Sequence, residues 1–294
     1  MIGIIIINYN TWNKTKKCVD SLLKLESDIK IIVVDNASTN DSKEKLLSIY
    51  KGLNDVHFIF ATKNKGYAAG LNLGANKAII LGCGYIICSN NDLIYNKYTI
   101  SNLKENLEKH DHIGICGARL IGTDGENQIS ATKLEPKFLN RVISIFKNTQ
   151  LPKYKREQKR LLNVTNEEEV FLVNGACFMI RIKDYIAIEG FDENTFLYCE
   201  ERIISYKMRK INKKILFCPN SHVIHEHSGT IGGVSPFSEI EFMKSNIYAI
   251  KEYESYNFFK VKLLIGLFKL KFIVKSFYIS DYKSSLKKLS DLNF

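Results

Sequence analysis

Residues 2–10 read IGIIIINYN, and residues 29–36 read IKIIVVDN. Each stretch is rich in Ile and Val and ends abruptly in polar residues. Nearly continuous β-branched runs are typical of strands that are buried on both faces, because a half-exposed strand alternates apolar and polar residues. The two stretches therefore predict the centre of an α/β fold with parallel strands.

The same pattern continues outward from these two stretches. Short apolar segments with strand character alternate with segments of helical period through residue 120. The predicted strands cover residues 2–8, 29–34, 56–60, 85–88 and 113–118, and the predicted helices cover residues 14–25, 42–51, 67–81 and 99–110. This alternation predicts a doubly wound, mostly parallel sheet, and such sheets bind ligands beyond the carboxyl ends of their strands.

Residues 121–169 break the alternation with several Gly and Pro residues and a dense run of Lys and Arg. We interpret this segment as a long, partly helical excursion from the sheet. Strand and helix character returns after residue 170. The last predicted strand covers residues 214–218, and Pro219 is expected to end it because proline has no N–H to donate.

The positive charge of the chain is concentrated in two segments. The 294 residues include 42 Lys and Arg against 31 Asp and Glu, a formal net charge of +11. Residues 133–160 contain nine basic and two acidic residues, and residues 257–294 contain eight and two. Because the remainder is close to neutral, we exclude a protein that coats nucleic acid and expect no nucleic-acid partner.

The cysteines and the amino-terminal segment indicate a cytoplasmic protein. The seven cysteines include no Cys-x-x-Cys pair, and most lie in apolar runs, which is typical of reduced thiols in a protein core. The first apolar run lacks the basic stretch and the small-residue cleavage site of a signal peptide. No apolar run is long enough to span a bilayer, so we expect a protein that is soluble or rests on a surface.

Polar residues directly follow the first two strands. Residues 8–10 end the first, and Asp35 and Asn36 begin a run of Asn, Ser and Thr after the second. A carboxylate at this place can accept hydrogen bonds from a ribose hydroxyl or from the N–H of a uracil or thymine base. The alternative is that these residues only form turns and cap the next helix, as Asx and Ser clusters often do.

Residues 64–74, NKGYAAGLNLG, form a loop that enters a helix with glycines at positions 66, 70 and 74. The pattern is neither GxGxxG nor GxxxxGK[ST], which argues against a dinucleotide dehydrogenase and against a P-loop NTPase. Glycines at this spacing allow close approach either of a ligand to the backbone or of the helix to the sheet. The sequence leaves both explanations open.

Two acidic motifs are candidates for chemistry. Asn90 and Asp92 follow the strand at residues 85–88, where a carboxylate beside an amide carbonyl can hold a divalent cation that also binds phosphate; the alternative is a turn that begins a helix. Glu200 and Glu201 stand together at a predicted helix start, where they either satisfy the positive helix end or supply a general base. No Cys/His set, His225 included, has the spacing of a structural zinc site.

In combination, these motifs resemble glycosyltransferase family 2. The resemblance covers residues 2–228, and it is closest to the bacterial rhamnosyl- and galactofuranosyl-type enzymes. It is carried by Asn-Tyr-Asn at 8–10, Asp-Asn-Ala-Ser at 35–38, residues 64–74, Asn-Asn-Asp at 90–92, Asn-Gly-Ala-Cys-Phe at 174–178, Gly-Phe-Asp-Glu at 190–193, Phe-Leu-Tyr-x-Glu-Glu at 196–201 and His225. The resemblance implies a GT-A fold and inverting transfer from a UDP- or dTDP-sugar to a glycan or lipid-linked acceptor in bacterial surface polysaccharide synthesis.

The resemblance also implies a role for each site residue. The residues expected to bind the donor nucleotide sugar are Asn10, Asp35, Asn36, Asn64, Gly66, Asn72, Asn90 and Asp92, with Asp35 on the base or ribose. Asp92 would also hold a divalent cation, Mg²⁺ or Mn²⁺, with His225 as a further ligand. Glu201 matches the general base of the family, and Glu200 matches the acidic partner that holds the acceptor.

The acidic motif departs from the family pattern in two ways. The usual Glu-Asp-x-Asp-Leu followed by Arg is replaced here by residues 200–204, EERII, followed by Lys207. The base is therefore one methylene longer and the third acid is absent, while the metal motif keeps only its last acid. A non-catalytic module of the same fold that binds a nucleotide sugar or a glycan is the alternative. A nucleotidyltransferase is disfavoured because residues 8–10 supply no Gly-rich, basic triphosphate loop.

The carboxyl-terminal part of the chain is expected to differ from the rest. Residues 1–228 would form the GT-A catalytic domain, and residues 229–294 a helical extension rich in lysine and aromatic residues. Within it, residues 257–294 either bind an anionic membrane surface or pack against the protein or in a homo-oligomer. Membrane binding would place the protein at the inner face of the cell membrane.

Overall fold

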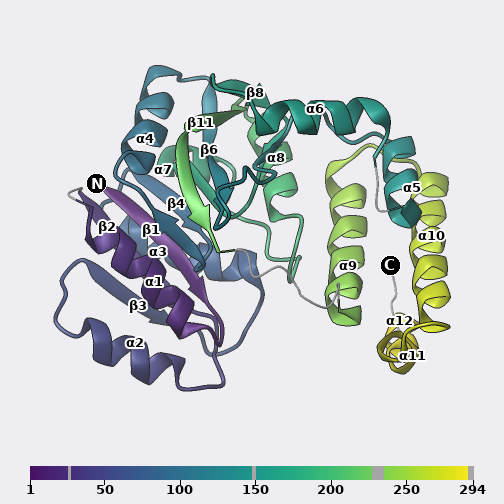
Figure 1. Ribbon diagram of the computed structural model, residues 1–294, viewed down its shortest axis with the longest axis horizontal. Coiled ribbons are helices and arrows are strands. Elements are labelled where there is room, and N and C mark those ends of the chain that lie inside the picture. Colours follow the sequence, from purple (N-terminus) through teal and green to yellow (C-terminus); the bar gives the residue numbers. More distant parts are fainter. Residues whose placement is uncertain (26–27, 148–149, 227–234, 291–294) are drawn as a thin grey trace.

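The computed structural model describes residues 1–25, 28–147, 150–226 and 235–290. In these ranges nine strands form one sheet in the order β3-β2-β1-β4-β10-β6-β11-β5, with β8 paired to β11 (Figure 1). The strands are β1 (Ile2–Asn8), β2 (Ile29–Asp35), β3 (Val56–Phe60), β4 (Tyr85–Ser89), β5 (Leu93–Tyr95), β6 (Ile113–Gly122), β8 (Glu168–Val170), β10 (Cys177–Arg181) and β11 (Lys214–His225).

The amino-terminal half of the sheet is parallel. β1 pairs with β2 on one side and with β4 on the other, and β2 pairs with β3. This register places Asn8 opposite Asp35 and Ile6 opposite Ser89, so the polar carboxyl ends of three strands meet at one edge. β10 then lies antiparallel between β4 and β6. The α/β fold class predicted from the sequence is confirmed.

Helices cover both faces of the sheet, as a doubly wound fold requires. The first face carries α1 (Trp12–Leu23), α2 (Ser42–Tyr50) and α4 (Thr99–Lys109), and the second carries α3 (Tyr67–Ile80), α7 (Ile182–Ala187) and α8 (Glu200–Lys210). Side chains of β1 alternate between these faces: Ile4 packs with Leu22 of α1, whereas Ile5 packs with Leu71 of α3. Burial on both faces explains the continuous Ile and Val run.

The predicted end of a strand at Pro219 is wrong. β11 continues to His225 and pairs in parallel with β6 before and after Pro219, with a register shift between Cys218 and His222. The bulge places proline where the ladder is interrupted, so its missing N–H leaves no gap in the pairing. This continuation carries His225 to the edge of the sheet, opposite Leu93 of β5.

The excursion after β6 is partly helical, as expected. It holds β7 (Ala131–Thr132), α5 (Phe138–Lys147) and α6 (Pro152–Leu162), and β7 pairs with β9 (Leu172–Val173) in a small separate sheet. The expected domain boundary at residues 228 and 229 lies outside the described residues.

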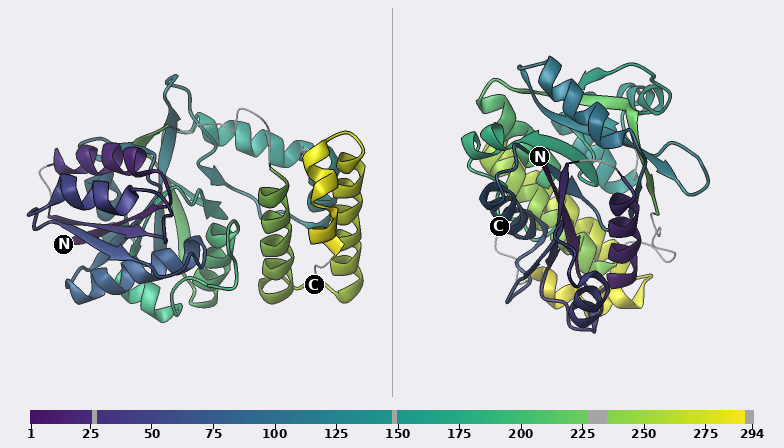
Figure 2. Two further views of the ribbon diagram at one scale, coloured as in Figure 1. Left: turned by 90° about the horizontal axis from the view of Figure 1, so that it is seen from below. Right: turned by 90° about the vertical axis from the view of Figure 1, so that its left-hand side faces the viewer.

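A second hydrophobic core lies beside the sheet domain. It is formed by α5 together with α9 (Pro236–Tyr253), α10 (Phe258–Ser276), α11 (Ser280–Ser284) and α12 (Leu286–Ser290). α9 stands between the sheet domain and α10 in two perpendicular views (Figures 1 and 2). None of the helices in the described ranges combines the length and the apolar character needed to cross a bilayer.

Candidate active site

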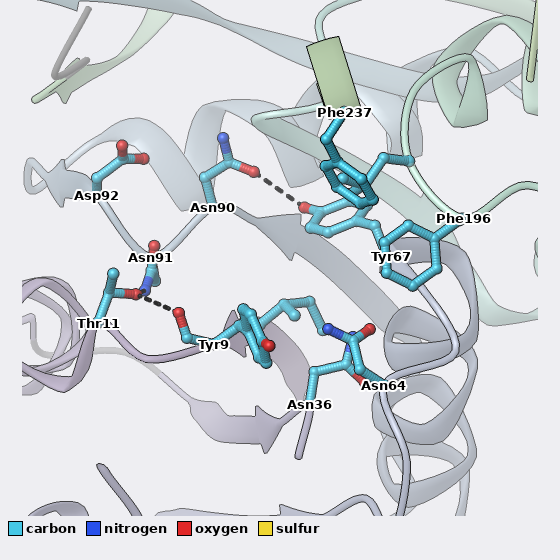
Figure 3. Close-up of a pocket in the computed structure, with 12 residues that line it drawn as sticks. Tyr9, Thr11, Asn36, Asn64, Tyr67, Asn90, Asn91, Asp92, Phe196 and Phe237 are labelled. Atoms are coloured by element: carbon cyan, nitrogen blue, oxygen red, sulfur yellow. Dashed lines mark hydrogen bonds between the residues drawn. The ribbon is translucent and has the colours of Figure 1, made fainter. Parts of the chain in front are cut away.

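A cavity of about 500 Å³ opens at the carboxyl ends of β1, β2 and β4 (Figure 3). Its lining is dominated by aromatic and amide side chains, with a single acid among the described residues. The lining residues are Ile7, Tyr9, Thr11, Asn36, Asn64, Tyr67, Asn90, Asn91, Asp92, Phe196, Leu197 and Phe237. Apolar walls with a few polar groups are typical of a small-molecule site.

Four of the residues predicted to bind the donor line this cavity: Asn36, Asn64, Asn90 and Asp92. Asn10, Asp35 and Gly66 do not, but each adjoins a lining residue in the chain. The prediction that they contact a nucleotide stays a prediction.

A hydrogen-bond network fixes the first two strand ends around Asp35. The Asn8 side-chain amide donates to one Asp35 oxygen at 2.7 Å, and the Ser38 backbone N–H donates to the other at 2.8 Å. Asn10 has left-handed backbone, with φ of 58°, and its side-chain oxygen accepts a hydrogen bond from the Thr39 N–H at 2.8 Å. The Asx and Ser cluster therefore builds a rigid rim beside the cavity.

Gly66 brings the motif at residues 64–74 into contact with the motif at residues 196–201. Its φ of 100° is unfavourable for other residues, and a Cβ atom would overlap the backbone of Phe196. The next N–H, of Tyr67, donates to the Phe196 carbonyl oxygen at 2.9 Å. Gly70 and Gly74 instead face Ile7 and Ile5 of β1. For these two glycines, close packing of helix on sheet is the explanation.

Asn72, also predicted to line the donor pocket, does not line this cavity. Its amide nitrogen donates to the Phe191 carbonyl oxygen at 2.9 Å and to the Glu193 carboxylate at 2.8 Å, and its amide oxygen accepts from the Tyr185 hydroxyl and the Phe191 N–H. All of these partners are in or beside the turn at residues 190–193. Asn72 therefore holds that turn on α3.

Asp92 lies in a positively charged corner of the cavity. The Nε2 atom of His225 is 3.4 Å from its Oδ1, and the Lys14 Nζ is 3.7 Å from its Oδ2. Burial opposes ionisation of this carboxyl, but His225 and Lys14 outweigh burial and lower its pKa. A strand, β5, follows Asp92 where the sequence also allowed a turn that begins a helix.

Gln128 sets the orientation of the His225 ring. Its side-chain oxygen is 2.7 Å from Nδ1, and its amide nitrogen donates to the His225 carbonyl oxygen at 3.4 Å. This arrangement places a proton on Nδ1 and turns Nε2 toward Asp92. The Oδ1 atom of Asp92 is buried and makes no hydrogen bond within the described part of the chain. A carboxylate oxygen and an imidazole nitrogen that face one another suit a divalent cation, although no third acid, His or Cys joins them among the described residues.

Glu200 and Glu201 occupy the first turn of α8. Burial, together with the charge of Glu201, raises the pKa of Glu200 to about 8. Burial also raises the pKa of Glu201, whose Oε2 lies 3.7 Å from the position of a Cβ on Gly175. The pKa of Tyr67 is raised by burial and by the charges of nearby groups that include Glu200 and Asp92. The charges of Glu200 and Asp92, one from each acidic motif, therefore both act on one aromatic residue of the cavity.

The turn before Glu200 is strained. Tyr198 and Cys199 both have left-handed backbone, with φ of 74° and 71°, which costs about 1–2 kcal/mol per residue. α9 supports this turn: Ser245 donates to the Leu197 carbonyl oxygen at 2.6 Å, and Cys199 packs against Ala249. The carboxyl-terminal helices thus position the candidate base.

Sequence reasoning missed several residues of the cavity. Tyr9 and Thr11 flank Asn10 and could have been found from their place after β1. Phe237 begins α9, and its ring packs edge-on against Phe196 with centroids 6.2 Å apart. Nothing in the local sequence of Phe237 indicates this contact, because it depends on how the helical extension packs.

Comparison with known protein families shows which family this chain belongs to. Residues 3–186 match the family model described as "Glycosyl transferase family 2". The chain belongs to this family. The sequence resemblance to glycosyltransferases is thereby confirmed.

Relatives and solved structures agree with the family. A hexosyltransferase of low-salt glycan biosynthesis, Agl10 from Haloferax volcanii, is 25% identical over 76% of this chain and 66% of its own length. The N-acetylglucosaminyl-diphospho-decaprenol L-rhamnosyltransferase of Mycobacterium tuberculosis is 21% identical over 84% of this chain and 83% of its own.

Two solved structures share the GT-A-like fold. GalNAc-T7, crystallised with UDP, GalNAc and Mn²⁺, is 19% identical with a TM-score of 0.65, over 87% of this chain and 49% of its own. The mannosyltransferase PcManGT from Pyrobaculum calidifontis, in complex with GDP-Man and Mn²⁺, is 13% identical with a TM-score of 0.60, over 100% of this chain and 76% of its own. At these identities the likeness concerns the fold.

Proposed function

We propose that this protein transfers a sugar from a nucleoside-diphosphate sugar to a hydroxyl group of a glycan or lipid-linked acceptor, with inversion at the anomeric carbon. The observation that carries the proposal is one cavity that Asp92 and Tyr67 line, with His225 against Asp92 and with the charge of Glu200 acting on Tyr67. The names of the relatives support hexosyl or deoxyhexosyl transfer. The UDP and GDP-Man complexes of the structural neighbours support a nucleotide donor.

In this proposal Asp92 and His225 would hold a divalent cation, Mg²⁺ or Mn²⁺. The buried Asp92 oxygen without a hydrogen bond and the orientation of His225 by Gln128 support this assignment. The cation, when bound, would neutralise charge on the leaving diphosphate. Lys14 adds positive charge on the other side of Asp92. Asn36, Asn64 and Asn90 would supply hydrogen bonds to the donor.

Glu201 would act as the general base. Its carboxylate takes the proton of the acceptor hydroxyl while that oxygen bonds to the anomeric carbon, and the bond from this carbon to the diphosphate breaks with its electron pair. A single displacement inverts the configuration. Burial raises the pKa of Glu201, which makes its ionised form a stronger base than an exposed carboxylate. Glu200 would bind the acceptor beside it.

The experiment that tests the proposal is a donor panel. UDP-, dTDP- and GDP-sugars are added with and without Mn²⁺ or Mg²⁺, and thermal stabilisation and slow donor hydrolysis are measured. The proposal expects at least one donor to stabilise the protein in a metal-dependent way and to be hydrolysed. Stabilisation without hydrolysis or transfer would instead support the non-catalytic binding module, which the Glu200–Glu201 departure keeps open. No response to any donor would contradict both.

A further inference from the structure

The outer face of α10 carries a row of exposed apolar side chains. Their spacings of three, four and seven residues each return to nearly the same side of the helix, and the last of them follows its carboxyl end. Their exposed fractions range from 40% to 80%. They are Phe259, Leu263, Leu270, Ile273, Val274 and Phe277, which we call the α10 stripe.

The α10 stripe is distinct from the face that α10 buries. Val261, Leu264, Phe268 and Phe272 pack into the core that α10 shares with α5 and α9. α10 is therefore apolar on two sides, which explains why lysines interrupt its sequence without giving a simple amphipathic pattern. α9 lies between α10 and the sheet domain (Figures 1 and 2). At 100° per residue, the stripe lies on the side of α10 opposite the face that packs into the core shared with α9.

Lysines border the α10 stripe. Residues 258–276 contain five lysines and no acidic residue. At 100° per residue, Lys262 and Lys269 lie along one border of the stripe. Lys271 and Lys275, on the opposite side, form ion pairs with Glu239 of α9 at 3.1 and 2.6 Å. Positive charge is thus concentrated where the apolar row meets solvent.

We propose that the α10 stripe binds an anionic lipid bilayer, with α10 lying in the plane of the membrane surface. Apolar side chains would enter the interface while Lys262 and Lys269 reach the lipid phosphates, as long lysine side chains do at such surfaces. A second copy of this chain fits the stripe less well. Pairing two stripes antiparallel about a twofold axis would bring the lysine borders together, and in either orientation of the pair α10 offers no acid to compensate the lysines. Charge complementarity therefore favours the bilayer.

The experiment measures sedimentation of the full chain with phosphatidylcholine vesicles and with vesicles of equal parts phosphatidylcholine and phosphatidylglycerol. We expect binding to the anionic vesicles that is at least about fivefold stronger and that weakens as salt is raised. The variant L263E/L270E should bind at least about tenfold more weakly, because it places two acids in the apolar row.

A matched control is I80E/L53E, which makes the same chemical change at two exposed apolar residues outside α10. It should bind anionic vesicles like the unchanged protein. Equal losses in both variants, or no binding of the full chain to anionic vesicles, would overturn the proposal. So would sedimentation velocity without vesicles showing a dimer that L263E/L270E abolishes. Nucleotide binding should be unchanged in both variants, so a failed donor assignment remains distinguishable from a failed membrane assignment.

Discussion

Asp92 and the Glu200–Glu201 pair have opposite electrostatic surroundings. Asp92 faces His225 and Lys14, and these groups lower its pKa despite burial. Glu200 and Glu201 are neighbours in the first turn of α8, and burial raises the pKa of both. Asp92 is therefore held ionised, whereas the Glu200–Glu201 pair retains a proton. This division is what a transferase needs, because a cation site requires a permanent charge whereas a general base must take up a proton.

The difference also has a structural origin. The position of Asp92 is set by strand pairing. Asp92 directly precedes Leu93, the first residue of β5, and the pairing of β5 with β11 places Leu93 opposite His225. Glu200 and Glu201 are placed by a strained turn that α9 supports. The ionised site therefore belongs to the sheet, and the proton-accepting site depends on the helical extension.

The largest effect that tests this division is expected from E201Q. Glutamine keeps the size of the side chain but cannot take a proton, so transfer should fall by about a thousandfold. Metal-dependent nucleotide binding should stay normal, because Asp92 is unchanged. The measurements are initial transfer rates and isothermal titration with the nucleotide. If E201Q turns over normally while E200Q does not, the two glutamates have exchanged the roles proposed for them.

D92N should produce the complementary result. Removing the charge leaves His225 and Lys14 without their shared carboxylate, and we expect Mn²⁺-dependent nucleotide affinity to fall about a hundredfold. Nucleotide affinity without metal should change little. The matched control is D124N, an exposed acid outside the cavity lining. Unchanged affinity of D92N with Mn²⁺ would remove Asp92 from the metal site.

The two sites also differ in how far sequence reasoning reached. The strand ends that carry Asn8, Asp35 and Asn90 were predictable, because a buried run followed by polar residues is a local signal. The parallel order then brings these ends together, so the polar rim of the cavity at these strand ends followed largely from pattern alone. The role of Asn72 did not, because a helical position near a glycine motif does not reveal which direction the side chain faces.

The surroundings of Glu200 and Glu201 were less predictable for the same physical reason. Glu200 and Glu201 were recognised, but their pKa values depend on burial that is created by tertiary packing. The support from Ser245 and the ring of Phe237 come from α9, whose contacts have no local sequence signal. The continuation of β11 past Pro219 was missed because a bulge satisfies the ladder without the proline N–H.

E200Q tests the proton-retaining site through stability. The ordinary pKa of this carboxyl is 4.5, and in the folded protein it is about 8. Between these values the unfolded chain releases the proton while the folded chain keeps it, so rising pH favours unfolding. Glutamine removes this penalty. Relative to the unchanged protein, E200Q should gain on the order of 1–2 kcal/mol between about pH 5 and about pH 8, measured by urea unfolding.

The control for this measurement is E126Q, which removes an exposed acid far along the chain from α8. Its stability relative to the unchanged protein should not vary over the same pH range. If the stability of E200Q relative to the unchanged protein also does not vary with pH, Glu200 is ionised in the folded protein. The contrast with Asp92 would then be lost.

The smallest effect is expected from Q128M, which tests how the ionised site is oriented. Methionine is similar in length to glutamine but cannot accept the His225 Nδ1 proton, so the ring loses the contact that directs Nε2 toward Asp92. Losing a partner of this kind weakens metal binding about tenfold. Mn²⁺ titration followed by nucleotide binding measures the change, with thermal unfolding as a check on folding.

Q128E separates orientation of the ring from simple packing at residue 128. A carboxylate still accepts the Nδ1 proton and makes the imidazole a better ligand, so Mn²⁺ affinity should equal or exceed that of the unchanged protein. A role in packing alone predicts that both variants lose affinity in proportion to their lost stability. Because Gln128 contacts His225 and not Glu200 or Glu201, neither variant should alter the pH dependence of unfolding that E200Q removes. If a substitution at Gln128 changes both Mn²⁺ affinity and the pH dependence of unfolding, the Asp92 site and the Glu200–Glu201 site are not independent.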